Sequence, residues 1–314
     1  MKSFILREQS RNDERMEKGT YRMKVISNVL KMRRISSELK QMGKSVGLVP
    51  TMGYLHEGHI SLIKRSVSEN DVTIVSIFVN PIQFGSGEDL NSYPRDFEKD
   101  REICEDFNVD YIFSPSAEDM YPNEFYSFVD IEILTETLCG KKRPGHFRGV
   151  LTVVSKLFNI SRADRAYFGE KDIQQLLIVK KMVDDLNMNV EIVACETVRE
   201  EDGLAKSSRN IHLSEEERKA AAVIKRSLDI AENMIIKKGT TKSKAVIQAI
   251  RSELLSEPLV SIDYVEIVSA NNLKPVEDIK DIISKENIVL AIAVIIGETR
   301  LIDNVVVNKQ TMRK

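Results

Sequence analysis

The apolar positions of residues 23–200 follow two periods in turn. Short runs rich in β-branched residues recur along the chain, and between several of them apolar residues return at helical spacing. Strands and helices that alternate in this way favour a parallel sheet with crossover helices, the doubly wound class. The predicted strands are 46–49, 72–79, 109–113, 165–168 and 190–194. A predicted helix at 26–42 opens the fold. The other predicted helices are 60–67, 97–107, 150–158 and 173–186.

The pattern changes near residue 200. Ser214 and Glu217 form a capping-box signature for a helix that reaches about Lys238, and a second helix follows shortly after. Three runs then predict consecutive strands, at 259–268, 288–296 and 301–307. We therefore predict an α/β fold. A Rossmann-like domain with a doubly wound parallel sheet spans 23–200, and a second, smaller α+β C-terminal domain spans 201–314.

Residues 1–22 are almost wholly polar, with charges of both signs. Their acidic residues and the lack of an apolar stretch favour an upstream extension over a processed leader. The total of 314 residues agrees with two domains, because single cores seldom grow beyond about 250 to 300 residues.

The charge balance excludes several classes of partner. Lys and Arg number 46 against 48 Asp and Glu, so no overall field would hold nucleic acid or an anionic membrane surface. The longest apolar run, 288–297, is about half of what a bilayer crossing needs. The three cysteines show neither disulfide nor zinc-site spacing. We expect a cytoplasmic protein without nucleic-acid or membrane partners.

The richest chemistry lies between the predicted strand 46–49 and the helix after it. The sequence there is PTMGYLHEGH, with Gly53, His56, Gly58 and His59 in one turn. Ligands bind at the carboxyl ends of parallel strands, and a helix N-terminus there offers free N–H groups to a phosphate. The glycines allow close approach of an anion, and the two imidazoles can donate hydrogen bonds to phosphate oxygens as negative charge develops.

Other interpretations of this turn stay open. A His-x-x-His pair can hold a metal, but that site needs a third ligand, which only His146, His212 or a remote carboxylate would supply. The usual nucleotide signatures are missing, because Gly43-Lys44-Ser45 lacks the earlier glycine of a P-loop. If ATP binds, the histidine turn must hold it.

His56-Glu57-Gly58-His59 resembles the His-x-Gly-His signature of the nucleotidyltransferase superfamily that includes class I aminoacyl-tRNA synthetases. Further motifs narrow this resemblance to the pantothenate synthetase family, across roughly residues 23–304. These motifs are 49–59, 76–85, Tyr93-Pro94-Arg95, 143–154, 169–175 and 207–210.

The resemblance implies an AMP-forming carbon–nitrogen ligase. It would join (R)-pantoate to β-alanine through a pantoyl adenylate, with ATP as co-substrate, Mg²⁺ as cofactor, and a homodimer as the assembly. The substrates are small molecules of the coenzyme A pathway. The sequence does not identify a protein ligand to the metal, although Asp100 is a candidate for a contact through water.

The family pattern assigns the ATP contacts residue by residue. His59 falls on the position of the family's proton donor. The family more often has Met or Leu where this chain has Lys206, so only a nucleotide contact is carried over there. The implied ATP-binding residues are Met52, Gly53, Tyr54, Leu55, His56, Glu57, Gly58, His59, Gly169, Glu170, Lys171, Asp172, Val198, Lys206, Ser207, Ser208 and Arg209. The implied catalytic residues among them are His56, His59, Lys171, Ser207, Ser208 and Arg209.

Asn80, Gln83 and Gln175 are the candidate contacts to pantoate and β-alanine. Their amides cannot ionise, so they can orient a carboxylate and hydroxyls without adding charge. A solvated helix position is the plain alternative for Gln175.

Two rival functions remain at this stage. Another nucleotidyltransferase with a phosphorylated acceptor would call for Arg or Lys where the three amides stand. A nucleotide-sensing module would bind ATP without releasing pyrophosphate.

Overall fold

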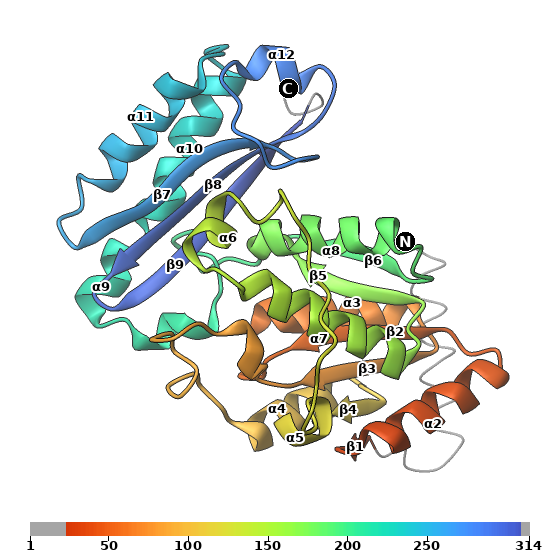
Figure 1. Cartoon of the computed structure of the whole chain (residues 1–314). Helices are drawn as coiled ribbons and strands as arrows, with labels where there is room; N and C mark the ends of the chain where they lie inside the picture. Colours follow the sequence, from red (N-terminus) through yellow and green to blue (C-terminus); the bar gives the residue numbers. More distant parts are fainter. Residues whose placement is uncertain (1–22, 309–314) are drawn as a thin grey trace, which may run out of the picture.

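The computed structural model describes residues 23–308, so the predicted extension 1–22 and the residues after 308 lie outside the described chain. It contains a six-stranded sheet flanked by helices, followed in the sequence by a smaller three-stranded sheet (Figure 1).

The large sheet is parallel throughout its pairs and has the order β1-β4-β3-β2-β5-β6. Its chain order reverses between β2 and β5, and ligands of doubly wound sheets bind at such a switch point. The histidine turn follows β2 directly. The strands are β1 Lys24–Ile26, β2 Val46–Thr51, β3 Val72–Ile77, β4 Tyr111–Phe113, β5 Arg165–Gly169 and β6 Glu191–Cys195.

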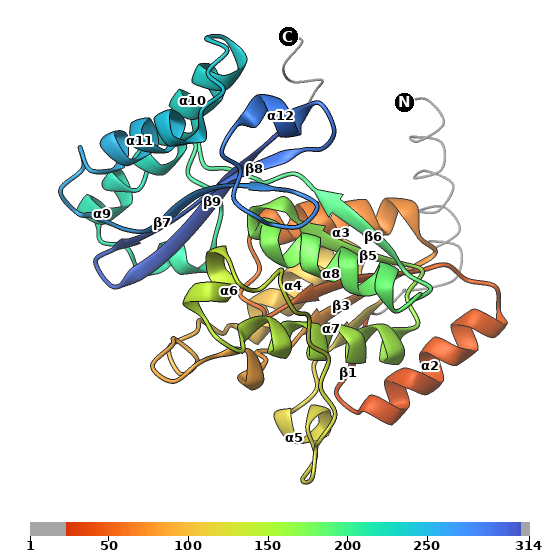
Figure 2. The same cartoon turned by 45° about the horizontal axis from the view of Figure 1, so that its top comes forward.

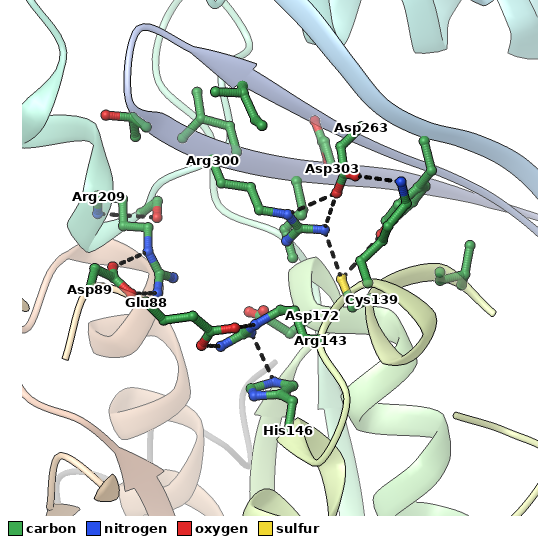
Figure 3. A pocket seen from close by; sticks show the side chains of 18 of the residues that line it. Glu88, Asp89, Cys139, Arg143, His146, Asp172, Arg209, Asp263, Arg300 and Asp303 are labelled. Carbon is green, nitrogen blue, oxygen red and sulfur yellow. Dashed lines mark hydrogen bonds and ion pairs between the residues drawn. The ribbon is translucent and has the colours of Figure 1, made fainter. Parts of the chain in front are cut away.

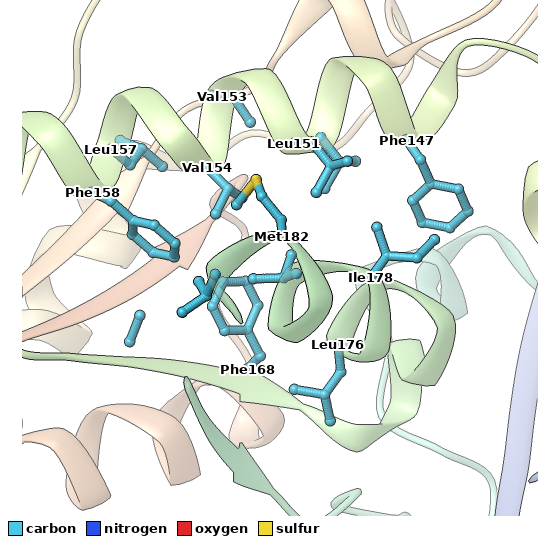
Figure 4. Packing of buried hydrophobic residues seen from close by; sticks show 14 of the residues in the cluster. Phe147, Leu151, Val153, Val154, Leu157, Phe158, Phe168, Leu176, Ile178 and Met182 are labelled. Carbon is cyan, nitrogen blue, oxygen red and sulfur yellow. The ribbon is translucent and has the colours of Figure 1, made fainter. Parts of the chain in front are cut away.

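Helices cover both faces of the large sheet. On one face α7 packs against α8 and β5, through Phe147, Leu151, Ile178, Met182 and Phe168 among others (Figure 4). On the other face α3 and α4 pack over β2 and β3. The predicted doubly wound class is therefore confirmed. The helices are α2 Val29–Gln41, α3 Glu57–Glu69, α4 Phe97–Asp106, α7 His146–Ser161 and α8 Ile173–Asp185.

The small sheet is antiparallel, in the order β7-β8-β9 (Figure 2). Alternate residues of the central strand β8 face opposite sides: Leu290 and Ile292 belong to a core with α10 and α11, while Ala291 and Ala293 join the core that contains α7, α8 and strands of the large sheet. Both faces of β8 are therefore apolar and buried, so the small sheet is covered on both sides. The elements are β7 Val260–Ser269, β8 Ile288–Ile296, β9 Thr299–Val307, α10 Val223–Ile236, α11 Ser243–Leu254 and α12 Ile279–Ile283.

The prediction that a helix opens the described chain at residue 26 is wrong. Ile26 ends the strand β1, and the helix begins at Val29 after Asn28, whose Oδ1 accepts a hydrogen bond from the Lys31 N–H at 2.9 Å. Three residues are too few for an alternating pattern to be separated from a helical one. The strand predicted first in the chain, 46–49, is therefore the second.

The predicted helix from Ser214 to about Lys238 consists of two helices, α9 Glu215–Ala220 and α10. Its capping box is confirmed, with the Ser214 N–H 2.8 Å from Glu217 Oε2. At the junction the Ile224 N–H donates to the Ala221 carbonyl, three residues back. A right-handed turn of the 3₁₀ type therefore joins the two helices. Other bounds shift by a few residues: the strand predicted at 72–79 ends at Ile77, and α3 and α7 begin before the predicted 60 and 150.

Candidate active site

The histidine turn folds back on the N-terminus of α3. The His56 Nδ1 accepts a hydrogen bond from the Gly58 N–H at 3.1 Å, and the His59 Nδ1 accepts from the His56 N–H at 3.3 Å. Both imidazoles therefore carry their proton on Nε2, and each can donate it to a ligand. A Cβ at position 58 would lie 2.8 Å from the His56 Cε1, so the His56 imidazole can take this position only beside a glycine.

Both histidines are neutral near pH 7. Burial, helped by the positive charge of Lys171, lowers the pKa of His56 to about 4. Burial, with a further contribution from His56, lowers the pKa of His59 well below its usual value. The pair therefore acts as hydrogen-bond donors in the free protein and carries no positive charge there.

Asp100 of α4 accepts hydrogen bonds from the backbone of the histidine turn. Its carboxylate accepts from the Tyr54 N–H at 2.8 Å and the Leu55 N–H at 2.6 Å. Gly53 has φ +84°, and a Cβ there would lie 2.9 Å from Asp100 Oδ2. Both oxygens of this candidate metal contact thus bind backbone N–H groups, and sequence reasoning missed this positioning role.

A second loop reaches the same edge of the sheet after β5. The 3₁₀ turn η2 Glu170–Asp172 carries Lys171, whose side chain lines the cavity described below. Asn304 of β9 donates to the Glu170 and Lys171 carbonyls at 2.9 and 3.0 Å. The small sheet therefore positions Lys171, a contact that sequence reasoning did not reveal.

The third segment is Ser207 with the 3₁₀ helix η3 Ser208–His212. Arg209 donates from Nε and Nη2 to both oxygens of Asp89, at 2.7 and 3.0 Å, which leaves Nη1 to meet a ligand. The neighbouring Glu88 pairs with Arg143 in the same way (Figure 3). The acidic pair thus holds both guanidinium groups at the rim of the site.

Lys206 directly precedes Ser207 in the chain. Its ammonium lies 2.7 Å from Glu200 and 3.3 Å from Glu57, which is in the first turn of α3. The side chain therefore joins the segment before Ser207 to the histidine turn. Val198, the other residue expected to contact the nucleotide there, donates nothing from its side chain but its carbonyl accepts from the Lys206 N–H at 2.9 Å.

The three candidate amides come from two other segments of the chain. Asn80 directly precedes the 3₁₀ turn η1 Pro81–Gln83, and Gln83 is the last residue of that turn. Gln175 lies in the first turn of α8. Gln175 is half-buried, whereas its neighbour Gln174 is buried and bonds the carbonyls of Leu134 and Thr137. Of these two neighbouring glutamines, Gln175 is the one that faces the site.

A cavity of about 220 Å³ brings most of the predicted residues together. A second cavity, of about 970 Å³, adjoins it beneath β9 (Figure 3). The two cavities share the lining residues Lys171, Asp172, Gln175, Ser207 and Arg209. Five predicted residues, all within the described chain, do not line the smaller cavity: Gly53, Tyr54, Leu55, Glu57 and Glu170. Its predicted lining residues are Met52, His56, Gly58, His59, Asn80, Gln83, Gly169, Lys171, Asp172, Gln175, Val198, Lys206, Ser207, Ser208 and Arg209.

The remaining histidines lie away from this turn. The His146 ring is 2.8 Å from the Gln83 carbonyl and 3.1 Å from Arg143, and burial lowers its pKa to about 4. His212 is exposed in η3.

Among residues 23–308, no group of three or more His, Cys, Asp or Glu side chains is arranged to hold a metal ion. The same residues contain no helix long and apolar enough to cross a bilayer.

Comparison with known proteins identifies the family. Residues 24–306 match the family model described as pantoate-beta-alanine ligase. A pantothenate synthetase of Caldicellulosiruptor bescii is 54% identical over 287 residues, which cover 91% of this chain and 99% of the relative.

Two solved structures are also similar. One, from Thermus thermophilus, is a pantothenate synthetase with 44% identity and a TM-score of 0.83, covering 90% of this chain and 99% of its own. The other, a pantoate-beta-alanine ligase of Francisella tularensis complexed with beta-gamma ATP and beta-alanine, has 36% identity and a TM-score of 0.72, with 90% and 97% covered. From its sequence, fold and site, this chain belongs to the pantoate–β-alanine ligase family.

Proposed function

We propose that this chain condenses (R)-pantoate with β-alanine at the expense of ATP, giving pantothenate, AMP and pyrophosphate. One observation carries the proposal: neutral imidazole donors, cationic side chains and uncharged amides line a single cavity at the switch point of the sheet. The first two sets suit a triphosphate, and the third suits a small hydroxy acid.

In the first step a carboxylate oxygen of pantoate attacks the α-phosphorus of ATP, and the bond from that phosphorus to pyrophosphate breaks. The reaction needs no protein nucleophile, so the protein supplies alignment and charge stabilisation. The Nε2–H groups of His56 and His59 donate to the phosphate oxygens. Lys171 and the free Nη1 of Arg209 add positive charge, and Ser207 and Ser208 complete the loop around the phosphates.

In the second step the amine of β-alanine attacks the acyl carbon of pantoyl adenylate. The bond from that carbon to the AMP oxygen breaks, and the proton that the amine loses as the amide forms passes to the leaving phosphate of AMP or to water. Gln83 and Gln175 hold the pantoyl group through these changes without a charge of their own.

Mg²⁺ enters with ATP in this proposal. Phosphate oxygens and water would supply its ligands, as they commonly do for Mg²⁺ in nucleotide sites, and the ion would neutralise part of the phosphate charge. Asp100 binds the Tyr54 and Leu55 N–H groups directly, and its proposed contact to the ion runs through water.

The rival with a phosphorylated acceptor has less support. That acceptor would need further cations beside the α-phosphate, whereas the cavity that contains Lys171 is also lined by the uncharged amides of Asn80 and Gln83. A homodimer in the cytoplasm is the proposed state. Its support is the exposed apolar surface of Tyr126, Phe128 and Ile133, and light scattering of the purified protein tests it.

Isotope exchange between labelled pyrophosphate and ATP tests the function, with pantoate present and β-alanine left out. A reversible adenylate predicts exchange that needs both pantoate and Mg²⁺. Added β-alanine should then yield AMP and pantothenate one for one. A terminal nucleotidyltransferase would keep the nucleotide in its product, and a sensing module would exchange nothing. Label entering ATP only with β-alanine present would contradict the two-step order.

A further inference from the structure

The carbonyl of Gly149 fixes which way the Asn80 amide points. One terminal atom of that amide lies 3.1 Å from the Gly149 carbonyl oxygen. A carbonyl can only accept, so this atom must be the nitrogen Nδ2, and the other must be Oδ1. Asn80 is 1% exposed, so no solvent competes for these bonds. The buried amide is therefore locked in one orientation.

Tyr121 occupies the oxygen of the same amide. Its hydroxyl lies 2.7 Å from Asn80 Oδ1 and must donate, because that oxygen only accepts. The residue directly follows the short helix α5 Ala117–Met120, and its ring packs beside Phe78 and edge-on to Phe125. Burial raises the pKa of the Tyr121 hydroxyl, which keeps it protonated as a donor.

The second Nδ2 hydrogen of Asn80 then fixes Gln83. It points at the Gln83 amide at 3.0 Å, so the facing atom must be the acceptor Oε1. Gln83 Nε2 is left beside the sulfur of Met52 at 3.1 Å, a weak acceptor that a stronger one can replace. The Gln83 side chain therefore offers N–H donors to the cavity.

The backbone of Gln83 is held as firmly as its amide. His146 Nδ1 donates to the Gln83 carbonyl, because the guanidinium of Arg143 supplies the hydrogen at the other ring nitrogen. A Cβ at Gly149 would lie 2.4 Å from the Ile82 carbonyl oxygen, so only glycine allows α7 to approach the turn this closely. The hydrogen bonds that run from Tyr121 through Asn80 to Gln83 therefore act on side chains whose backbone is fixed.

We propose that Tyr121 is a positioning residue for pantoate: through Asn80 it orients the Gln83 amide so that Nε2 donates to an oxygen of the bound acid. This role rests on the proposed function. A reversed Gln83 amide would present its oxygen to a carboxylate or hydroxyl oxygen and weaken binding. Tyr121 lines neither cavity, so in this proposal it acts on the acid only through the two amides.

The test is Tyr121→Phe, which keeps the ring and removes only the hydroxyl. The apparent KM for pantoate in pyrophosphate exchange should rise about 3- to 10-fold, the loss expected from one hydrogen bond. The KM for ATP should change by less than about 2-fold, because the amides do not contact the phosphates. Tyr111→Phe is the matched control, since this tyrosine is partly buried in β4 and lines neither cavity, and it should leave both constants unchanged.

A double-mutant cycle with Asn80→Ala separates this role from general packing. Once Asn80 is gone, Tyr121→Phe should have no further effect on the pantoate KM, because the two residues act in series. Equal weakening of ATP and pantoate, additive effects, or an unchanged KM would overturn the proposal. If the unmodified chain shows no pantoate-dependent exchange, the proposed function fails and this role fails with it. Normal exchange that Tyr121→Phe leaves unaltered overturns the role alone.

Discussion

Replacing Gly58 with Ala should separate activity from stability. The new Cβ would lie 2.8 Å from the His56 Cε1, whereas ordinary contacts begin near 3.4 Å. The imidazole must therefore retreat by about 0.6 Å or more, and its hydrogen bond from the Gly58 N–H weakens. A misplacement of about 1 Å can cost about 100-fold in rate. We expect the rate of adenylate formation to fall about 10- to 100-fold.

Stability should respond in the opposite sense. Gly58 lies in the first turn of α3 without a left-handed φ, and Ala is favoured over Gly in helices by up to about 1 kcal/mol. The melting temperature should stay within about 3 °C of the original or rise. Single-turnover adenylation and calorimetry measure the two effects.

Gly85→Ala serves as the matched control. Its new Cβ would meet only the Glu88 side chain, at an ordinary 3.6 Å, so both quantities should remain unchanged. An adenylation rate of Gly58→Ala within about 2-fold of the original would refute the need for the His56 placement. A melting temperature lowered by many degrees would show that the substitution acts through folding.

Three further predictions concern the histidines and the N-terminus. His59→Ala should lower the single-turnover rate of adenylation by about 10² to 10³ with a smaller effect on ATP affinity, since one donor to developing charge is lost; an unchanged rate would contradict its role. Because the pKa of His56 is lowered in the folded protein, its imidazole is protonated at a higher pH in the unfolded chain. The free energy of unfolding should therefore decrease as the pH falls from about 6.5 to about 4. Denaturant titrations of the protein and of His56→Ala measure this, and an equal slope in both would contradict it. Deleting residues 2–22 should leave activity and melting temperature nearly unchanged, because the family match begins at residue 24; a melting temperature lowered by several degrees would show that the segment packs.

The sequence by itself determined the layered fold and the centre of the site. Apolar periodicity is a local property, so runs such as 46–49 and 173–186 predicted their elements to within a few residues. The histidine turn is contiguous in the chain, and the carboxyl edge of a parallel sheet is the place where such a turn binds ligands. The strand β1 escaped this reasoning because three residues show no distinct period.

Only the tertiary structure decided how the site is held. Asp100 reaches the backbone of Leu55 across 45 positions of the chain, and Asn304 reaches Lys171 across 133. Local patterns carry no signal for such partners, because each polar side chain looks like any other until the fold brings the two together. The orientation of the Gln83 amide depends likewise on Tyr121 and on the carbonyl of Gly149, which meet at Asn80 only when α7 packs on the sheet.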